Sequence, residues 1–108
     1  MIVEMREYTL HSGTVPEYLK LYEHEGLAIQ REILGHMVGY YRTEVGSAVN
    51  EVVHLWAYDS FEDRQQRRAR LAADPGWQSY VRKIRPMLVE QRNRIMYPAS
   101  FFEPELHA

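Results

Sequence analysis

The sequence contains no cysteine among its 108 residues. Disulfide bonds, thiolate metal sites and a nucleophilic thiol are therefore excluded. This composition fits a protein of the reducing cytoplasm, which is the location we expect. No window approaches the run of about 18 apolar residues that a membrane-spanning helix needs, so no membrane partner is expected. The first six residues lack the basic segment and long apolar run of a signal peptide, and we expect none.

Strong charge and recognisable catalytic motifs are also missing. The formal net charge is −2, so we expect no general electrostatic attraction to nucleic acid. There is no glycine-rich phosphate loop and no nucleophile elbow. His24–Glu25 is not followed by the second histidine of a zinc-protease motif, and the other histidines show no ligand spacing. We therefore predict neither a metal nor a cofactor.

The composition that remains is typical of a soluble globular domain. Apolar residues make up 45% of the chain and charged residues 26%. A chain of this length has room for one domain, residues 1–108, with one modest hydrophobic core.

Alternating residue patterns predict four strands, and helical spacing predicts the segments between them. The strands are expected at 2–10, 36–45, 50–58 and 89–97, with Gly46–Ser47 beginning the connection between the second and third. The fourth strand is rich in polar residues, so we place it near an edge. One helix is expected to end at Gly35, and a second is expected from about residue 60 to Pro86 with an interruption near residue 73.

Capping residues mark where these helices begin. Thr14 with Glu17 predicts a capping box, and Ser60 with Asp63 resembles one. Asp74, followed by proline, predicts a new helix start after the interruption. Gly26 lies inside the first helix, where it costs about 1 kcal/mol relative to alanine, and it predicts a bend or a close contact.

The resulting element order, β-α-β-β-α-β, predicts the ferredoxin-like α+β fold. In this fold both helices cover one face of a four-stranded antiparallel sheet, and strands one and three are adjacent in its centre. The other face of the sheet is left open.

The third strand has two different faces. We assign Val53, Leu55 and Ala57 to the helix-covered core, because they form a plain apolar set. The open face would then carry large amphipathic side chains, which are costly to leave in water. We therefore expect two sheets to pair face to face in a homodimer, enclosing a space lined by both chains. The residues assigned to this open face are Glu4, Arg6, Tyr8, Val52, His54, Trp56 and Tyr58. For the strand at 36–45, the pattern does not assign a core face.

Several segments of the chain resemble the NIPSNAP family. They are residues 1–10, the His-Leu-Trp-Ala-Tyr-Asp-Ser run within residues 52–60, Asp63–Arg64, Asp74–Pro75, Trp77, and Ile84-Arg85-Pro86. The resemblance covers nearly the whole chain. It implies a dimeric α+β barrel, in the structural group of small cofactor-independent monooxygenases and lactone isomerases. It implies no particular reaction, since members of the family have no settled catalytic role.

His54 is the best single catalytic candidate. It lies in the middle of a strand beside another strand carrying Glu4 and Arg6, and could transfer a proton near neutral pH. The competing interpretation is a histidine satisfied by Glu4 or by a backbone carbonyl, which stabilises the dimer.

The predicted substrate-binding residues are Arg6, Tyr8, Trp56 and Tyr58. Arg6 could fix a carboxylate or enolate by a bidentate contact, or it could simply form an ion pair with a neighbouring acid. The aromatic residues could wall a pocket or pack in an interface, and these two interpretations are compatible.

Four arginines give the second helix a basic surface. Such a surface could bind phosphate or RNA, but no nucleic-acid motif accompanies it. We therefore interpret it as solvated and partly facing the acidic residues Glu17, Glu23 and Glu25. The four are Arg64, Arg67, Arg68 and Arg70.

Two functions remain open. The first is binding of a small molecule inside the barrel, with cofactor-independent oxygenase-like or isomerase-like chemistry as an extension. The second is a non-catalytic dimeric interaction module with a packed interior. A cavity of about 300 Å³ or more with convergent polar groups favours the first function.

Overall fold

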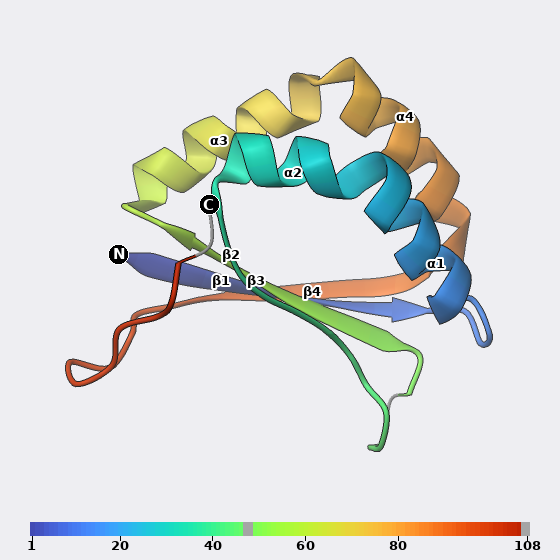
Figure 1. Ribbon diagram of the computed structural model, residues 1–108, viewed down its shortest axis with the longest axis horizontal. Coiled ribbons are helices and arrows are strands. Elements are labelled where there is room, and N and C mark those ends of the chain that lie inside the picture. The colour runs from blue at the N-terminus through green and yellow to red at the C-terminus, as the bar shows by residue number, and fades with distance from the viewer. Residues whose placement is uncertain (47–48, 107–108) are drawn as a thin grey trace.

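The computed structural model describes residues 1–46 and 49–106, in which the elements follow the predicted order (Figure 1). The strands are β1 (Ile2–Leu10), β2 (His36–Arg42), β3 (Glu51–Tyr58) and β4 (Leu88–Met96). The helices are α1 (Val15–Leu21), a π-helical segment η1 (Tyr22–Gly26), α2 (Leu27–Leu34), α3 (Phe61–Ala73), α4 (Pro75–Ile84) and a 3₁₀ turn η2 (Arg85–Met87). No helix in this described part is long and apolar enough to cross a membrane.

The strands form one antiparallel sheet in the order β2-β3-β1-β4. Strands β1 and β3 are the central neighbours, with Arg6 opposite His54, and β4 lies at an edge, as predicted. The run formed by α1, η1 and α2 and the run formed by α3 and α4 both cover the same face of this sheet (Figure 1). The predicted ferredoxin-like α+β fold is therefore confirmed. Strand β2 ends at Arg42, three residues earlier than expected. The predicted turn residue Ser47 lies outside the described residues.

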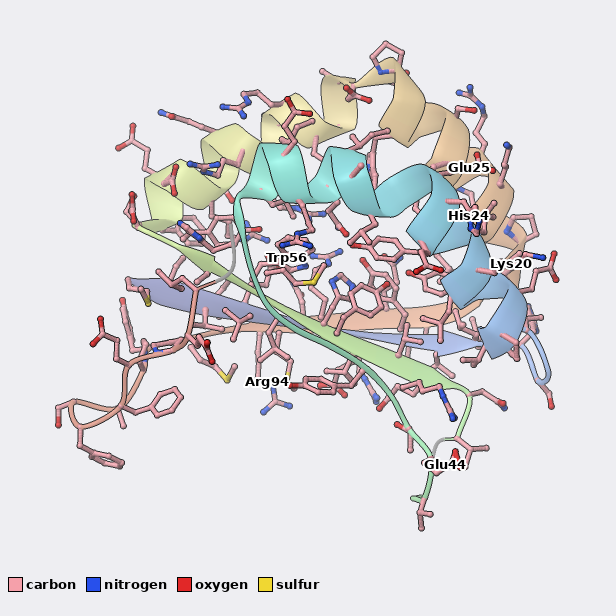
Figure 2. The ribbon with its side chains drawn as sticks, in the orientation of Figure 1. Lys20, His24, Glu25, Glu44, Trp56 and Arg94 are labelled. Atoms are coloured by element: carbon pink, nitrogen blue, oxygen red, sulfur yellow. The ribbon has the colours of Figure 1, made fainter. Side chains whose placement is uncertain are left out.

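The assignment of the two sheet faces was wrong. The helices cover Val52, His54, Trp56 and Tyr58, each 2% exposed or less, while Val53 and Leu55 lie partly exposed on the open face. Trp56 lies between the sheet and the helices in Figure 2. Strand alternation determines which residues share a face, but not which face the helices cover. Here the helices bring polar and aromatic partners of their own, so the amphipathic side chains are buried within one chain.

The helix starts agree with two of the three capping predictions. Ser60 accepts a hydrogen bond from the Asp63 N–H at 3.0 Å, and Asp74 accepts one from Trp77 at 2.8 Å. The capping box predicted at Thr14 and Glu17 is wrong, because the Thr14 hydroxyl instead donates to the His11 carbonyl at 2.7 Å. Capping by a side chain needs an extended backbone, and Thr14 has already adopted helical angles.

Gly26 allows the π-helical segment η1 to approach α4 closely. It ends the π-helical segment, and a Cβ atom placed on it would lie 3.1 Å from the Tyr80 ring and 3.0 Å from Tyr22. The close contact predicted at this glycine is therefore confirmed. Single π-helical turns of this kind occur frequently at functional sites.

We expect the substitution Gly26→Ala to lower the free energy of unfolding by about 1–3 kcal/mol, as overpacking in a core does. Alanine is the better helix former, but its methyl group would press on the buried rings of Tyr22 and Tyr80. Urea denaturation measures the change. Ala28→Gly, at an exposed position two residues away, reports the helix propensity alone. A more stable Gly26→Ala variant would contradict the close packing described here.

The open face of the sheet combines apolar and charged side chains. Glu7 lies 3.5 Å from Arg92 and 3.7 Å from Arg94 in ion pairs between β1 and β4. Arg94 points away from the helices in Figure 2. Tyr41 on β2 is 62% exposed. This face therefore presents apolar surface beside a row of paired charges.

Candidate functional site

A cavity of about 470 Å³ lies between the helices and the sheet. This volume exceeds the minimum of about 300 Å³ that favours small-molecule binding. Its exposed lining residues, including Arg85 and Glu90, lie where η2 joins β4, and this region forms its mouth. The interior is lined mainly by Arg6, Tyr8, Tyr18, Tyr22, Gln30, Tyr40, His54, Arg68, Trp77 and Tyr80.

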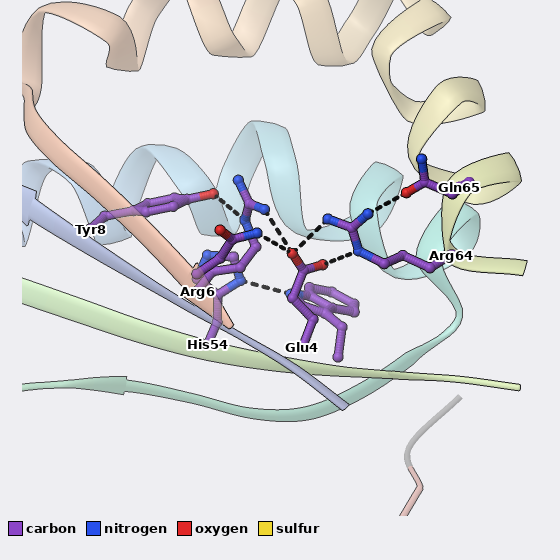
Figure 3. Close-up of polar contacts among 8 residues, drawn as sticks. Glu4, Arg6, Tyr8, His54, Arg64 and Gln65 are labelled. Carbon is purple, nitrogen blue, oxygen red and sulfur yellow. Dashed lines mark hydrogen bonds and ion pairs between the residues drawn. The ribbon is translucent and has the colours of Figure 1, made fainter. Parts of the chain in front are cut away.

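The buried carboxylate of Glu4 lies beside this cavity and pairs with two arginine side chains, Arg6 and Arg64 (Figure 3). The Glu4 side chain is fully buried, and it accepts hydrogen bonds from Arg6 at 3.0 Å, from Arg64 at 2.8 and 3.0 Å, and from Asn93 at 2.7 Å. Burial opposes ionisation, but the bonds from Arg64 and Asn93 and the charge of Arg6 outweigh it, lowering the pKa of Glu4 to about 2. Glu4 is therefore an anion at neutral pH.

Arg6 is held in place from both sides. Its Nη1 donates to Glu4, and its Nε donates to the Tyr8 hydroxyl at 3.0 Å. The predicted ion pair with a neighbouring acid is thus present, yet the Arg6 side chain also lines the cavity. A guanidinium fixed in this way can contribute to anion binding with little loss of conformational entropy.

The protonation state of His54 follows from its partner. The indole Nε1 of Trp56 donates to His54 Nδ1 at 2.7 Å. An indole nitrogen can only donate, so Nδ1 must be the acceptor and the proton must sit on Nε2. His54 Nε2 is buried and has no hydrogen-bond partner in the part of the chain that the structure describes. His54 therefore brings an N–H donor to the cavity wall.

His54 is also kept neutral. Burial, followed by the charges of Arg6 and Arg68, lowers the pKa of His54 to about 3. Its ring stacks on Tyr40 with centroids 4.8 Å apart and meets the edge of Tyr8 at 4.9 Å. The predicted proton transfer near neutral pH does not fit this environment, since the imidazole would rarely be protonated. A neutral histidine that donates a hydrogen bond fits it well.

Tyrosines from the helices and from β2 complete the walls. The Tyr18 and Tyr40 hydroxyls lie 3.1 Å apart, and Tyr22 donates to Gln30 at 2.6 Å. Burial raises the pKa of Tyr18 to about 12 and raises that of Tyr80 further. These hydroxyls are therefore neutral at pH 7 and are available as donors or acceptors.

The structure brings together three of the five predicted site residues, and it corrects the predicted location. Arg6, Tyr8 and His54 line the cavity, whereas Trp56 and Tyr58 pack behind it in a second apolar cluster. Trp56 reaches the site only through its hydrogen bond to His54. The predicted place, on an open face between two sheets, is wrong because this set of side chains faces the helices of its own chain.

Arg64 and Arg68 of α3 belong to the site, although sequence reasoning assigned them to a solvated surface. Arg64 and Arg68 turn inward to Glu4 and to the cavity, and Arg67 binds Asp63 and the Ile33 carbonyl. The predicted solvated surface is therefore wrong for Arg64, Arg67 and Arg68, whereas Arg70 is exposed to solvent as expected. The sequence held a signal, because residues 64, 68 and 71 share one helix face and the apolar Leu71 marks that face as a candidate for the core.

Within residues 1–46 and 49–106, no three histidine, aspartate or glutamate side chains lie close enough to hold a metal ion. The polar groups in the cavity interior are guanidinium, imidazole N–H and phenol groups and the Gln30 amide, while the Glu90 carboxylate lies exposed at the mouth. Such groups recognise anions and polar aromatic molecules.

Comparison with known proteins identifies relatives. The NIPSNAP family model matches residues 3–103. Human "Protein NipSnap homolog 3A" is 37% identical over 75 residues, which are 69% of this chain and 30% of that protein. The chain thus spans less than a third of this curated relative.

Solved structures show the same fold. A NIPSNAP family protein with unknown function from Agrobacterium tumefaciens has 48% identity and a TM-score of 0.93, covering 97% of this chain and 94% of that one. A putative antibiotic biosynthesis monooxygenase from Nitrosomonas europaea has a TM-score of 0.68 at 11% identity, covering 93% of this chain and 99% of that one. The second likeness concerns the fold alone.

Proposed function

We propose that this chain, which belongs to the NIPSNAP family, binds a small molecule in the cavity between its helices and its sheet. The observation that carries the proposal is the cavity of about 470 Å³, lined by Arg6, His54 and Arg68 together with several tyrosines. A well-formed pocket with a few convergent polar groups is the usual form of a small-molecule site. The cavity favours this function over the interaction-module alternative, which requires a packed interior.

The arrangement also supports a second candidate, isomerase-like or cofactor-independent oxygenase-like chemistry. Enolate-forming reactions need donors aimed at a developing oxyanion, in a site shielded from water. His54 supplies a neutral N–H donor, and Arg6 and Arg68 supply positive charge. A neutral histidine donor of this kind polarises carbonyl groups in known isomerases. This chemistry would assign His54 the role of stabilising charge rather than moving a proton.

A cavity-blocking variant tests the binding proposal. A thermal-shift screen of small aromatic and carbonyl metabolites at millimolar concentration should identify compounds that raise the melting temperature. Val81 lines the cavity on α4, so Val81→Trp should lower the affinity for each of these compounds by about tenfold or more. Arg82→Trp adds the same indole at an exposed position next to it and should leave affinity unchanged. Equal binding by both variants would place the ligand elsewhere.

We further propose that the chain forms a homodimer through its open sheet face. Partly exposed Met5, Val53 and Leu55, with Tyr41 beside them, give this face an apolar centre. Light scattering at low micromolar concentration should show twice the 12.8 kDa chain mass. Leu55→Glu should shift the protein to a monomer, whereas Glu44→Lys, exposed beyond the end of β2, should not. A stable wild-type monomer would refute the dimer, which needs at least about 1,000 Å² of buried surface.

A further inference from the structure

We infer that the cavity binds its ligand as an anion, a planar molecule whose carboxylate or similar delocalised oxyanion is held by Arg68 and by the Nε2–H of His54. This inference rests on the proposed function, because it assigns a ligand class to the same cavity. Two independent features carry it, an imbalance of charge and an imbalance of hydrogen-bond donors.

The first feature is the surplus of positive charge. Arg6 and Arg64 both bind Glu4, which is the only buried carboxylate in the part of the chain that the structure describes. Arg68 lines the same cavity, and it forms no ion pair within residues 1–46 and 49–106. The cavity side of the sheet therefore carries three guanidinium groups for one buried carboxylate. Glu90 at the mouth is exposed, and solvent screens its charge.

Arg68 is placed to act on a ligand. Its Nη1 is buried, and the protein group beside the guanidinium is the Tyr58 hydroxyl. Burial raises the pKa of Tyr58 to about 12, so this neighbour is neutral and does not balance the arginine. Leaving the buried Nη1 of this cation without an acceptor is costly, and a carboxylate would satisfy the guanidinium with two parallel hydrogen bonds.

The second feature is the surplus of donors. Trp56 fixes the His54 proton on Nε2, so this buried atom can only donate, and it has no acceptor in the described protein. Arg6 lies opposite His54 on the neighbouring strand, and both side chains line the same cavity as Arg68. A ligand oxyanion would accept from His54 and Arg68 together, whereas an amide of the same shape would offer one weaker acceptor and two redundant donors.

The walls favour a planar molecule. Tyr8, Tyr40, Tyr80 and Trp77 all line the cavity. Trp77 and Tyr80 lie with ring centroids 5.0 Å apart at the α4 side. Aromatic faces and edges pack well against a flat ring at offset or perpendicular angles. An aromatic or conjugated acid matches both the walls and the donors.

Matched acids and amides separate the contribution of charge from that of shape. We would titrate wild-type protein with benzoate, benzamide, 2-naphthoate and 2-naphthamide, following heat and tryptophan fluorescence. The affinity for each acid should exceed that for its amide by about tenfold or more, as expected for charge-assisted hydrogen bonds. Arg68→Gln should abolish this preference while amide affinity changes little. Arg70→Gln, an exposed arginine on the same helix, should keep it.

A conservative variant and a spectroscopic measurement distinguish a lost ligand contact from misfolding of Arg68→Gln. Arg68→Lys keeps the charge but loses the planar fork, so it should retain an intermediate preference for acids. Nitrogen-15 NMR should show His54 as the Nε2–H tautomer, with that proton moving downfield when benzoate binds. If benzoate binding left the His54 signals unchanged, His54 would not be part of the binding site.

The outcomes separate the two proposals. Equal affinity for acid and amide, unchanged in Arg68→Gln, would overturn the anion inference and leave small-molecule binding intact. Failure of all four probes, in protein that binds neutral compounds from the metabolite screen, would do the same. If no compound of either set binds, the proposed function itself fails.

Discussion

Replacing Glu4 with glutamine is expected to lower the free energy of unfolding by about 3–5 kcal/mol, the usual cost of removing one partner from a buried ion pair. Glu4 is fully buried and accepts hydrogen bonds from Arg6, Arg64 and Asn93. The neutral amide would leave two guanidinium groups facing each other without a counter-charge. Its NH₂ group would also place a donor where the carboxylate offered only acceptors.

Glu7→Gln is the matched control, on the same strand but on the open sheet face. Glu7 pairs with Arg92 and Arg94, whose side chains are 54% and 64% exposed, so its loss should cost about 1 kcal/mol or less. Guanidinium chloride denaturation of both variants gives the comparison. Similar small losses in the two would mean that Glu4 is not the central counter-charge of the site.

The same carboxylate predicts how stability depends on pH. The folded state lowers the pKa of Glu4 from 4.5 to about 2, so the folded protein holds its ionised form more strongly than the unfolded chain does. The resulting stability is complete above about pH 4.5, and it is lost as the pH falls toward 2. Glu4→Gln should remove this part of the acid dependence, so the variant and wild type should become more alike near pH 2.

The element order was predictable because it follows from local patterns. Strand β1 has the expected bounds, Ile2–Leu10, and the caps at Ser60 and Asp74 are those expected of their residue types. Thr14 shows the limit of such rules, since its backbone adopts helical angles and its hydroxyl donates to the His11 carbonyl instead of accepting from an N–H of the helix. Competition between two short-range hydrogen bonds is not visible in residue spacing.

The orientation of the sheet could not be predicted from β1 and β3 alone. Their alternation separates Val53 and Leu55 from His54 and Trp56, but burial depends on what the helices bring to the sheet. Arg64 supplies the counter-charge for Glu4, and Tyr18 and Tyr80 supply aromatic surface. Only a joint comparison of helix and strand faces would have shown that the polar set belongs inside.

The site residues on the central strands were therefore predictable, whereas the groups that surround them were not. Arg6, Tyr8 and His54 were grouped correctly, because neighbouring strands in register place them side by side. The state of His54 was not predictable. It depends on burial beneath the helices, on the cations Arg6 and Arg68, and on a hydrogen bond from Trp56, two residues away. His54 is therefore a neutral imidazole with its proton on Nε2, whereas the sequence predicted a group that transfers protons near neutral pH.

Replacing Trp56 with alanine is expected to cost about 3–5 kcal/mol of stability, as for other large aromatic truncations in a core. Trp56 is fully buried in a cluster with Leu34, Tyr58 and Leu71. The substitution would leave a cavity behind the site and would remove the only donor to His54 Nδ1 that the described residues provide. Thermal and urea denaturation measure the loss. An unchanged melting temperature would contradict the burial of Trp56.

Trp56→Phe separates packing from hydrogen bonding. Phenylalanine keeps most of the buried ring, so the stability loss should be smaller, about 1–3 kcal/mol. His54 Nδ1 would then lack its donor, and the proton could occupy either ring nitrogen. Nitrogen-15 NMR should show a single Nε2–H tautomer in wild type and a mixture in Trp56→Phe. Ligand affinity should fall with the population of the Nε2–H form, because only that tautomer presents the buried donor to the cavity. A single unchanged tautomer in Trp56→Phe would mean that another group fixes the His54 proton.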